Sequence, residues 1–251
     1  MIIRHKRKNR SPLVWIVLTA VMIAALAVIL NETLFRIGKV EVEGLKNISE
    51  REVLAQCGLE NGIGYFEVRE EALRDGVNRN RYLVYQGMEK VFPNRLILRV
   101  AEREIRACIT VQNQICLMDE NAFILEKADA GDAQGYIRIT GLSVRDAKVG
   151  EALSFTNTLQ ISAYTAVMQE LIVQDALDTF SEMNLANPSD VYLTSASGYL
   201  ISLGKPEEIR AKLLTVRGVL EYMRLYDMPK GSMDASVPGY ITFTPEDVQT
   251  L

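Results

Sequence analysis

The sequence predicts an α+β protein in which a single N-terminal transmembrane helix precedes two β-rich domains. The smaller domain has the order β-α-α-β-β, and the larger is a mixed β domain with helices packed on an antiparallel sheet. Two observations carry this prediction: an uncharged apolar run over 13–30, and, after it, short stretches of alternating apolar and polar residues separated by helical patterns and turns. We divide the 251 residues into a basic tail 1–12, a transmembrane helix 13–31, a first domain 35–104, a second domain 105–245 and a C-terminal tail 246–251.

The apolar run reads LVWIVLTAVMIAALAVIL and contains no charged residue. As a helix it would span about 27 Å, close to the hydrocarbon thickness of a bilayer. In lipid the backbone must pair within its own segment, so the run should be one helix. Basic residues beside a span stay on the cytoplasmic side. Five of them precede the run, which predicts a single-pass type II protein of the cell membrane with most of the chain outside: Arg4, Lys6, Arg7, Lys8 and Arg10.

A cleaved signal peptide is the alternative for this run. The apolar core of a signal peptide is shorter, about 7 to 15 residues, and ends at a small-x-small cleavage site. The candidate triplet Ala25-Leu26-Ala27 lies inside the run rather than after it. We therefore favour an uncleaved anchor. Small residues such as Ala20 and Ala24 could permit close helix approach, although a simple anchor explains them equally.

The charge distribution excludes one class of partner. All 32 Asp and Glu residues follow residue 30, together with 23 of the 28 Lys and Arg residues, so the outer part has a net charge near −9. A nucleic-acid partner is therefore not expected there. The apolar content of 48% is enough for a packed core.

The cysteine and histidine content limits redox and metal chemistry. Cys57, Cys108 and Cys116 make an odd number, which is not a disulfide framework. Cys108 and Cys116 flank a predicted turn at 112–114 and could be bonded across a hairpin, but small buried apolar side chains are the favoured interpretation. The only histidine, His5, lies in the basic tail. We expect no metal site and no cofactor.

Alternation and capping patterns define the elements of the first domain. Val40 and Val42 alternate with Glu41 and Glu43, as in a half-buried strand. Ser49 begins a capping box, which predicts a helix start. The expected elements are strands over 36–43, 82–91 and 96–101 and helices over 49–57 and 68–79.

The second domain should contain two longer helices among its strands. One helix is expected over 157–177, and a second should begin at Pro206, because proline is favoured at the first position of a helix. The second helix has apolar residues spaced 4, 3, 4 and 3 apart, which gives one apolar face: Ile209, Leu213, Val216, Leu220 and Met223. The expected strands before the last one cover 107–111, 115–118, 180–185, 190–194 and 199–203.

No catalytic arrangement stands out. Ser232-Met233 is similar to the Ser-Met pair of membrane-anchored signal peptidases, but those enzymes carry it just outside the anchor. A Ser-His-Asp triad would need a histidine outside the membrane. Glu102 and Glu104 share one strand face and could do acid–base work, although a solvated face is favoured. We therefore expect no enzymatic activity and no small-molecule substrate.

The last predicted strand is the candidate for partner binding. It covers about 240–243 and lies between Pro238 and Pro245. A strand that ends a sheet can accept a strand from another chain. Alternation places Tyr240 and Thr242 on one side and Ile241 and Phe243 on the other; ordinary core packing is the alternative. The candidate residues are Val237, Gly239, Tyr240, Ile241, Thr242 and Phe243.

Several motifs occur in a characteristic order along the chain. They are Val40-Glu41-Val42-Glu43-Gly44, Tyr65-Phe66-Glu67-Val68, Lys90-Val91-Phe92-Pro93-Asn94-Arg95-Leu96, Asp119–Leu125, Ile139-Thr140-Gly141-Leu142, Lys212-Leu213, and the segments 231–236 and 238–243. The first domain resembles a POTRA domain, and these motifs together resemble those of the FtsQ/DivIB family of bacterial cell-division proteins, in which the last two segments are the closing strands. Arg81 and Lys90 depart from the common pattern of that family, as does Ala122 where a glycine is usual.

This resemblance implies a non-enzymatic divisome scaffold at the division septum. It implies FtsL-like and FtsB/DivIC-like partners, the latter engaged through the C-terminal region, and a part in controlling septal peptidoglycan synthesis. The helix at 49–57 and the strand at 82–91 form a second candidate docking surface. Two alternatives stay open: a membrane-anchored cell-wall enzyme that uses a carboxylate pair, and a POTRA-bearing transport or folding factor.

Overall fold

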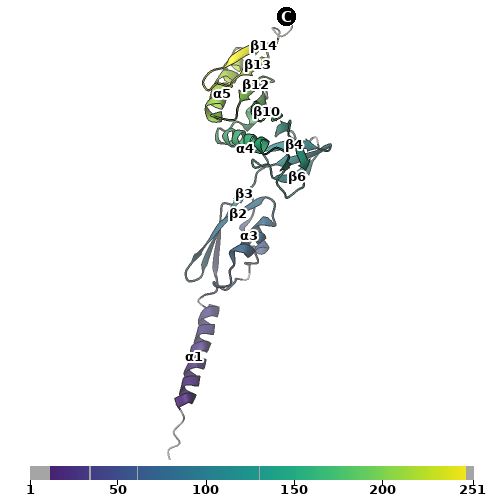
Figure 1. Ribbon diagram of the computed structural model, residues 1–251. Helices are drawn as coiled ribbons and strands as arrows, with labels where there is room; N and C mark the ends of the chain where they lie inside the picture. The colour runs from purple at the N-terminus through teal and green to yellow at the C-terminus, as the bar shows by residue number, and fades with distance from the viewer. Residues whose placement is uncertain (1–11, 34, 61, 130, 247–251) are drawn as a thin grey trace, which may run out of the picture. The chain divides into compact units, whose positions relative to one another are not determined.

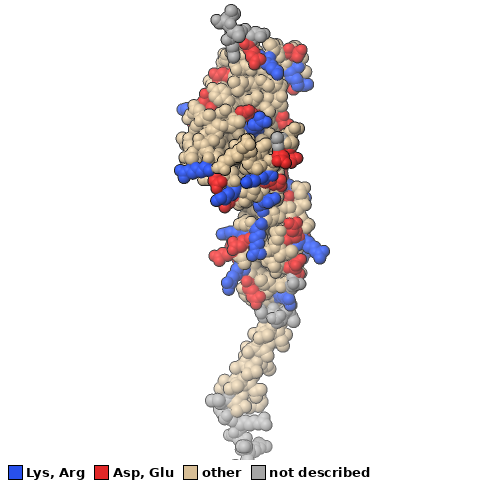
Figure 2. Space-filling model, turned by 90° about the vertical axis from the view of Figure 1, so that its right-hand side faces the viewer, with Lys and Arg blue, Asp and Glu red and all other residues tan. Residues whose placement is uncertain are grey.

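The computed structural model describes residues 12–33, 35–60, 62–129 and 131–246. The chain divides into two compact units between Glu102 and Arg103 (Figure 1). Helix α1 (Pro12–Thr33) precedes the folded part of the first unit, and its described surface carries no charged side chain in Figure 2. Among the described helices, none has the combination of length and apolar character that a membrane crossing requires. The basic residues expected on the cytoplasmic side lie outside the described ranges.

The folded part of the first unit has the predicted order β-α-α-β-β. Its elements are β1 (Lys39–Glu43), α2 (Glu50–Gln56), α3 (Glu70–Asn78), β2 (Leu83–Val91) and β3 (Arg95–Glu102). The sheet order is β1-β3-β2, with β1 parallel and β2 antiparallel to β3. The Ser49 hydroxyl accepts a hydrogen bond from the Glu52 amide at 3.3 Å, so the predicted cap is confirmed. The first strand was expected to begin at residue 36 and begins at Lys39. The second helix was expected to begin at residue 68 and begins at Glu70.

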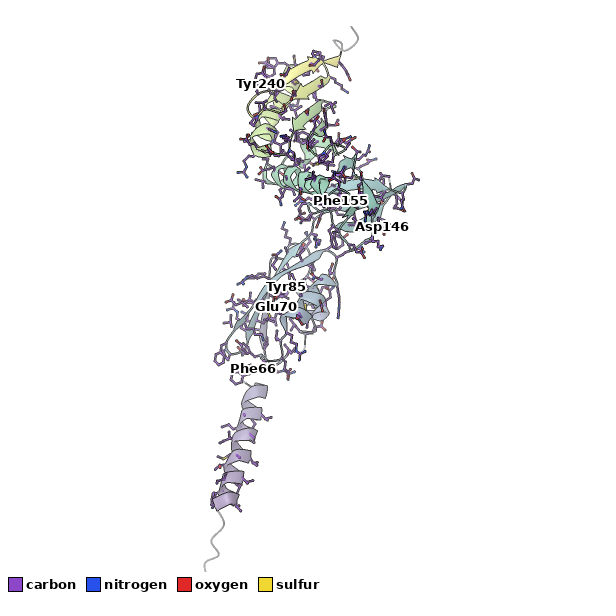
Figure 3. The ribbon with its side chains drawn as sticks, viewed as in Figure 1. Phe66, Glu70, Tyr85, Asp146, Phe155 and Tyr240 are labelled. Carbon is purple, nitrogen blue, oxygen red and sulfur yellow. The ribbon has the colours of Figure 1, made fainter. Side chains whose placement is uncertain are left out.

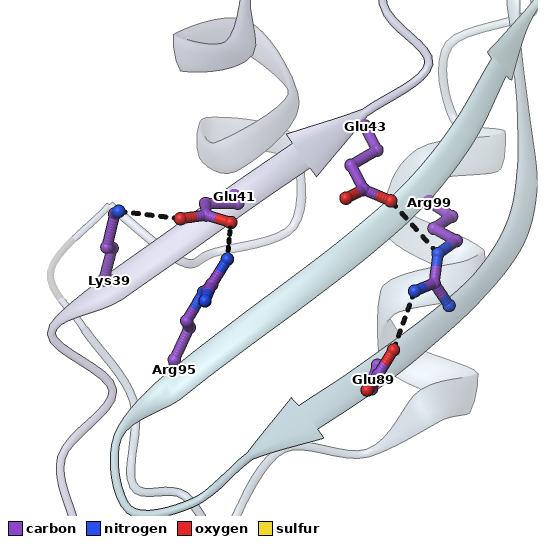
Figure 4. Close-up of polar contacts among 6 residues, drawn as sticks. All are labelled: Lys39, Glu41, Glu43, Glu89, Arg95 and Arg99. Carbon is purple, nitrogen blue, oxygen red and sulfur yellow. Dashed lines mark hydrogen bonds and ion pairs between the residues drawn. The ribbon is translucent and has the colours of Figure 1, made fainter.

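A ladder of ion pairs crosses the three strands of the first unit (Figure 4). Glu41 pairs with Arg95 and, at 2.7 Å, with Lys39. Arg99 pairs with Glu43 at 3.1 Å and with Glu89 at 2.7 Å. Hydrogen bonds from Lys39 and Arg95 lower the pKa of the Glu41 carboxyl. Exposed pairs of this kind contribute little to stability.

The second unit is built on a nine-stranded sheet. The strand order is β14-β13-β12-β11-β10-β7-β4-β5-β6. The described elements of this unit are β4 (Ala107–Val111), β5 (Gln114–Met118), β6 (Ile124–Ala128), β7 (Ile137–Thr140), β8 (Val144–Asp146), β9 (Ser154–Phe155), α4 (Thr158–Val173), a short 3-10 turn (Leu177–Thr179), β10 (Phe180–Asn184), β11 (Val191–Ser195), β12 (Leu200–Gly204), α5 (Ile209–Leu225), β13 (Gly231–Asp234) and β14 (Thr242–Pro245).

The prediction of an antiparallel sheet is wrong for this unit, because the sheet is mixed. Strands β7 and β10 are parallel, as are β12 and β13, and β4 and β7. The β7–β10 and β12–β13 pairs are parallel because a helix connects the two strands of each pair. Helix α4 carries the chain from β7 to β10 and α5 carries it from β12 to β13, and such a crossover returns the next strand in the same direction.

Helices α4 and α5 contribute to the same core as the sheet. The five α5 residues predicted to share an apolar face are all buried in this core, so that prediction is confirmed. The predicted start at Pro206 is wrong, since α5 begins at Ile209. The backbone explains the delay: Glu208 has a left-handed conformation with φ 52°, and Gly204 also has a positive φ.

The two sheet cysteines do not face one another. Strands β4 and β5 form a hairpin whose turn residues Gln112 and Asn113 have φ values of 49° and 66°, as a two-residue type I′ turn requires. In its register Cys108 is opposite Leu117, and Cys116 is opposite Ile109. Each cysteine is therefore opposite the sequence neighbour of the other, and the two side chains project to opposite faces of the sheet. Both are buried free thiols, as the favoured interpretation expects.

A buried carboxylate organises the start of the second unit. Asp119 is fully buried and forms an ion pair with Arg103 at 2.5 Å. Its other oxygen accepts hydrogen bonds from the Asn121 and Phe123 amides, each at 2.8 Å. These bonds close the turn that contains Ala122, which has a φ of 60°. A positive φ favours glycine, so Ala122 adopts a backbone conformation that is unusual for a residue with a side chain.

Glu102 performs a similar task at the end of the first unit. One of its carboxylate oxygens accepts hydrogen bonds from the backbone amides of Lys46, Asn47 and Ile48 at 2.7, 2.9 and 2.9 Å. Partial burial raises the pKa of Glu102, but these hydrogen bonds to the charged form outweigh it and the net pKa is lowered. The carboxylate thus fixes the turn after β1 to the end of β3.

We expect Glu102→Gln to lower the free energy of unfolding of the first unit by about 1–2 kcal/mol, because charge-assisted hydrogen bonds to three amides become neutral ones. Urea unfolding of the full chain in detergent, followed by circular dichroism, measures this loss. Glu60→Gln makes the same charge change at an exposed position and serves as the control. Equal stabilities for the two variants would contradict the assigned role of Glu102.

The same contact predicts a pH dependence. Because the pKa of Glu102 is lower in the folded chain than its ordinary value of 4.5, its stabilising contribution is complete above about pH 4.5. The contribution is lost as the pH falls through the folded-state pKa. The stability difference between the wild type and Glu102→Gln should therefore shrink in that acidic range, and a difference that stays constant would contradict the account.

Candidate functional site: the edge strand β14

Strand β14 forms one edge of the nine-stranded sheet and pairs antiparallel with β13. The sequence predicted the last strand over 240–243, whereas the strand covers Thr242–Pro245. Tyr240 lies before it, where its backbone amide donates to the Val237 carbonyl at 3.2 Å. Tyr240 therefore belongs to the turn that leads into the strand, and it is labelled there in Figure 3.

The pairing of β13 with β14 decides which backbone groups face outward. The Glu246 amide donates to the Lys230 carbonyl at 3.0 Å, which makes this a hydrogen-bonded pair. Such pairs alternate along antiparallel strands, so Thr244 and Thr242 bond to Ser232 and Asp234. The amide and carbonyl of Phe243 consequently point toward the open edge.

Pro245 fits this alternation of inward and outward backbone groups. It is opposite Gly231 and, like Phe243, directs its backbone nitrogen away from β13. A proline has no N–H to donate, and at an edge strand it is tolerated where that nitrogen faces outward. The outer side of the strand thus offers a donor and an acceptor at Phe243 and an acceptor alone at Pro245.

The side chains follow the predicted alternation. Ile241 and Phe243 pack against the core, and the Phe243 ring lies 6.3 Å from the ring of Tyr199. Tyr240 is 65% exposed, and Thr242 is also exposed. Val237 is exposed in the preceding turn, where Gly239 has a φ of 78°. Core packing therefore accounts for two of the six candidate residues, and the others are open to solvent or lie in the turn.

A buried lysine supports the strands behind the edge. Lys212 of α5 donates through Nζ to the carbonyls of Leu203 and Lys205 at 2.9 and 2.8 Å. Burial lowers the pKa of this ammonium group. The contact ties α5 to the end of β12, the strand next to β13. The Tyr199 hydroxyl adds a second tie by donating to the Met228 carbonyl at 2.9 Å.

A shallow polar hollow of about 710 Å³ is lined by residues of β11, β12, β13 and β14. Its acidic groups are engaged locally. Asp190 accepts hydrogen bonds from the hydroxyls of Tyr192 and Ser202 at 2.9 and 3.0 Å, and Asp234 accepts one from the Ser236 amide at 2.9 Å. The hydrogen bonds from Ser236 lower the pKa of Asp234. Its carboxyl group is thus held in the ionised form, which is the opposite of what a general acid requires.

The other candidate chemical groups are not assembled into a site. Glu102 is engaged by three backbone amides, and Glu104 forms an ion pair with Arg106 at 2.6 Å. Ser232 lies within β13, opposite Thr244. No cluster of His, Cys, Asp and Glu side chains within the described ranges could hold a metal ion.

The second candidate docking surface, made of the helix at 49–57 and the strand at 82–91, is only partly supported by the packing of these elements. Strand β2 is an edge of the three-stranded sheet, as a strand-accepting surface would need. Helix α3 packs against β2, while α2 packs against α3. The helix expected to share this surface with β2 is therefore not the one that lies directly beside it.

Comparison with known proteins identifies the class first. Residues 35–103 match the model of the POTRA domain, FtsQ-type. The folded part of the first unit is thus an FtsQ-type POTRA domain, and the sheet-based second unit follows it in the sequence.

Curated relatives extend the similarity over nearly the whole chain. The cell division protein DivIB of Clostridium botulinum (strain Hall) is 25% identical over 244 residues, which cover 96% of this chain and 93% of the relative. The cell division protein FtsQ of Geotalea daltonii is 26% identical over 211 residues, which cover 79% and 75%. Over most of its length the chain is therefore similar to proteins that are named as the cell division proteins DivIB and FtsQ, and its residues 35–103 match the FtsQ-type POTRA domain.

One small substitution should detach the edge strand. A Cβ added to Gly231 would collide with the Thr244 carbonyl oxygen and lie 2.8 Å from the Phe243 ring. We expect Gly231→Ala to speed amide exchange at Thr242 and Thr244 by at least about tenfold, which is a local loss of about 1.4 kcal/mol. Amide exchange of the full chain in detergent, read by mass spectrometry of C-terminal fragments, measures the effect.

Gly218→Ala is the matched control for this variant. A Cβ on Gly218 of α5 has no neighbouring atom within 4 Å, and alanine is the better helix former. Its exchange at Thr242 and Thr244 should equal that of the wild type. Slow exchange in Gly231→Ala would show that β14 is not paired as described.

Proposed function

We propose that the chain is a membrane-anchored divisome scaffold whose β14 edge accepts a strand from an FtsB/DivIC-like partner. An FtsL-like protein would join the same assembly. By holding these partners the chain would help to control septal peptidoglycan synthesis, without carrying out chemistry itself. The observation that carries the proposal is the outward-facing backbone of Phe243 at the edge of the sheet.

Strand addition suits this edge better than side-chain recognition does. In strand addition the backbone hydrogen bonds supply affinity, and alternate side chains supply specificity. Beside the open Phe243 backbone, Tyr240 and Thr242 present exposed side chains that an incoming strand could contact. Pro245 removes one donor, so the edge admits few registers.

The membrane anchor is part of the proposal. The run 13–30 contains no charged residue, and the large apolar side chains described between Val14 and Ile29 are exposed. An apolar helix with no side buried against protein is best accommodated in lipid. With basic residues ahead of it, the anchor would be single-pass with the N-terminus in the cytoplasm, at the division septum. The functional parts outside would be 35–104 and 105–245.

The test uses two substitutions at one position. Phe243→Ala and Phe243→Pro both remove the ring, but only the proline removes the amide donor. Because that amide faces outward, the proline should leave the bonds to β13 intact. We expect Phe243→Ala to retain most of the capture of the FtsB/DivIC-like partner when the full-length proteins are co-purified in detergent. Phe243→Pro should lower it by about tenfold or more, since a hydrogen bond at the centre of the added strand is lost.

Circular dichroism of both variants controls for unfolding. A depletion strain complemented with each variant supplies the cellular readout: Phe243→Ala should divide, and Phe243→Pro should form filaments. Equal capture by two folded variants would move the binding site away from this edge. Normal division of the depleted strain would contradict the role as a division scaffold altogether.

A further inference from the structure

Four aromatic rings from three separate segments cluster at one end of the POTRA domain. Phe35 lies 5.5 Å from Phe66 and 5.7 Å from Phe92, measured between ring centroids. Tyr65 lies 5.3 Å from Phe66 and 6.3 Å from Phe92. Each ring therefore contacts two others in a closed set, which we call the aromatic patch.

The outer half of the aromatic patch is not part of the core. Phe66 and Phe92 are each 68% exposed, whereas Phe35 and Tyr65 are only partly exposed beneath them. Both exposed rings contact Phe35 and Tyr65, so the four rings form a connected apolar group. Exposure of two phenylalanine rings to water is unfavourable, and exposed apolar surface of this kind marks contact with a protein or a membrane. Figure 3 labels Phe66 at the outer surface of the domain.

Backbone hydrogen bonds hold the aromatic patch in place. The Tyr65 amide donates to the Phe35 carbonyl at 2.6 Å, and the Ile37 amide donates to the Ile63 carbonyl at 2.9 Å. On the other side, the Gly38 amide donates to the Asn94 carbonyl at 3.0 Å. The segment that carries Phe35 is thus tied to both loops that carry the other rings, so the patch is preformed.

Chain connectivity places the aromatic patch close to α1. Phe35 follows Thr33, the last residue of α1, by two positions. Two residues of extended chain span at most about 7 Å. The aromatic patch is therefore close enough to the end of α1 to contact the same medium that surrounds this end.

We propose that the aromatic patch inserts into the headgroup region of the outer leaflet of the lipid bilayer, with Phe66 and Phe92 as its deepest residues. The proposal rests on the membrane anchor proposed above. Aromatic residues concentrate at membrane–water interfaces, and apolar faces of interfacial segments are buried there by about 5–10 Å. The Lys90 ammonium donates to the Val68 carbonyl at 2.8 Å and lies 5.6 Å from the Tyr65 ring centre, so it places a cation beside the patch.

The consequence is a second attachment of the POTRA domain to the membrane. Insertion of the aromatic patch would fix one end of the domain at the lipid surface and so restrict the directions in which the domain can meet other membrane-anchored proteins.

Tryptophan fluorescence of the full chain in proteoliposomes tests this proposal. Trp15, the only tryptophan, lies in α1 and reports on the anchor in the native chain. In a Trp15→Phe background, Phe66→Trp and Phe92→Trp report on the aromatic patch, and Tyr240→Trp is a control of similar exposure in the second unit. The vesicles contain phosphatidylcholine brominated either close to the headgroup or near the ends of the acyl chains.

We expect the Phe66→Trp and Phe92→Trp variants to lose more emission with shallow bromines than with deep ones, while the Tyr240→Trp variant loses none. Quenching of Trp15 without quenching of either patch variant would overturn the proposal and leave the anchor standing. An unquenched Trp15 would instead refute the anchor. Emission from the patch variants that changes only when a second protein is added would assign the patch to a protein partner and overturn the lipid contact.

Discussion

An open β-sheet must end in a strand whose outer backbone groups have no partner within the sheet, and in this protein β14 is such a strand. Its pairing with β13 turns every second residue inward, so Phe243 is left with both its donor and its acceptor facing outward. Pro245 occupies the next outward position and removes one donor from it. The result is a short edge that can be extended in few ways, which suits recognition of one strand and discourages indiscriminate edge-to-edge association.

The geometry behind β14 depends on a helical crossover. Because α5 carries the chain from β12 to β13, these strands run parallel and the final turn brings β14 to the outside of the sheet. Lys212 ties α5 to the end of β12, and the missing side chain of Gly231 lets β14 approach. The first unit uses the same kind of device at Glu102, where one carboxylate fixes a turn through three backbone amides. Both units therefore depend on single polar groups placed where the backbone would otherwise be unpaired.

The sequence predicted the features that have a strong local period. The strand at Val40 and Val42, whose side chains pack against the core of the first unit, and the apolar face from Ile209 to Met223 were both confirmed. Strands β8 and β9 have three and two residues, too few for a period to show. The parallel pairings depend on the geometry of the crossover connections, and the delayed start of α5 depends on a positive φ at Glu208. No local sequence pattern predicts either feature. The last strand was placed two residues early for a related reason: its register is set by the Lys230–Glu246 pair, and that pairing exists only in the folded sheet.

Amide hydrogen exchange at Phe243, measured on the full chain with and without the proposed FtsB/DivIC-like partner, tests the central claim most directly. In the free chain the Phe243 amide should exchange rapidly because it faces the open edge, while the Thr244 amide is protected by β13. On binding, the Phe243 amide should slow by at least about a hundredfold, which corresponds to about 2.7 kcal/mol of added protection. A Phe243 amide that still exchanges rapidly in the saturated complex would contradict strand addition at β14.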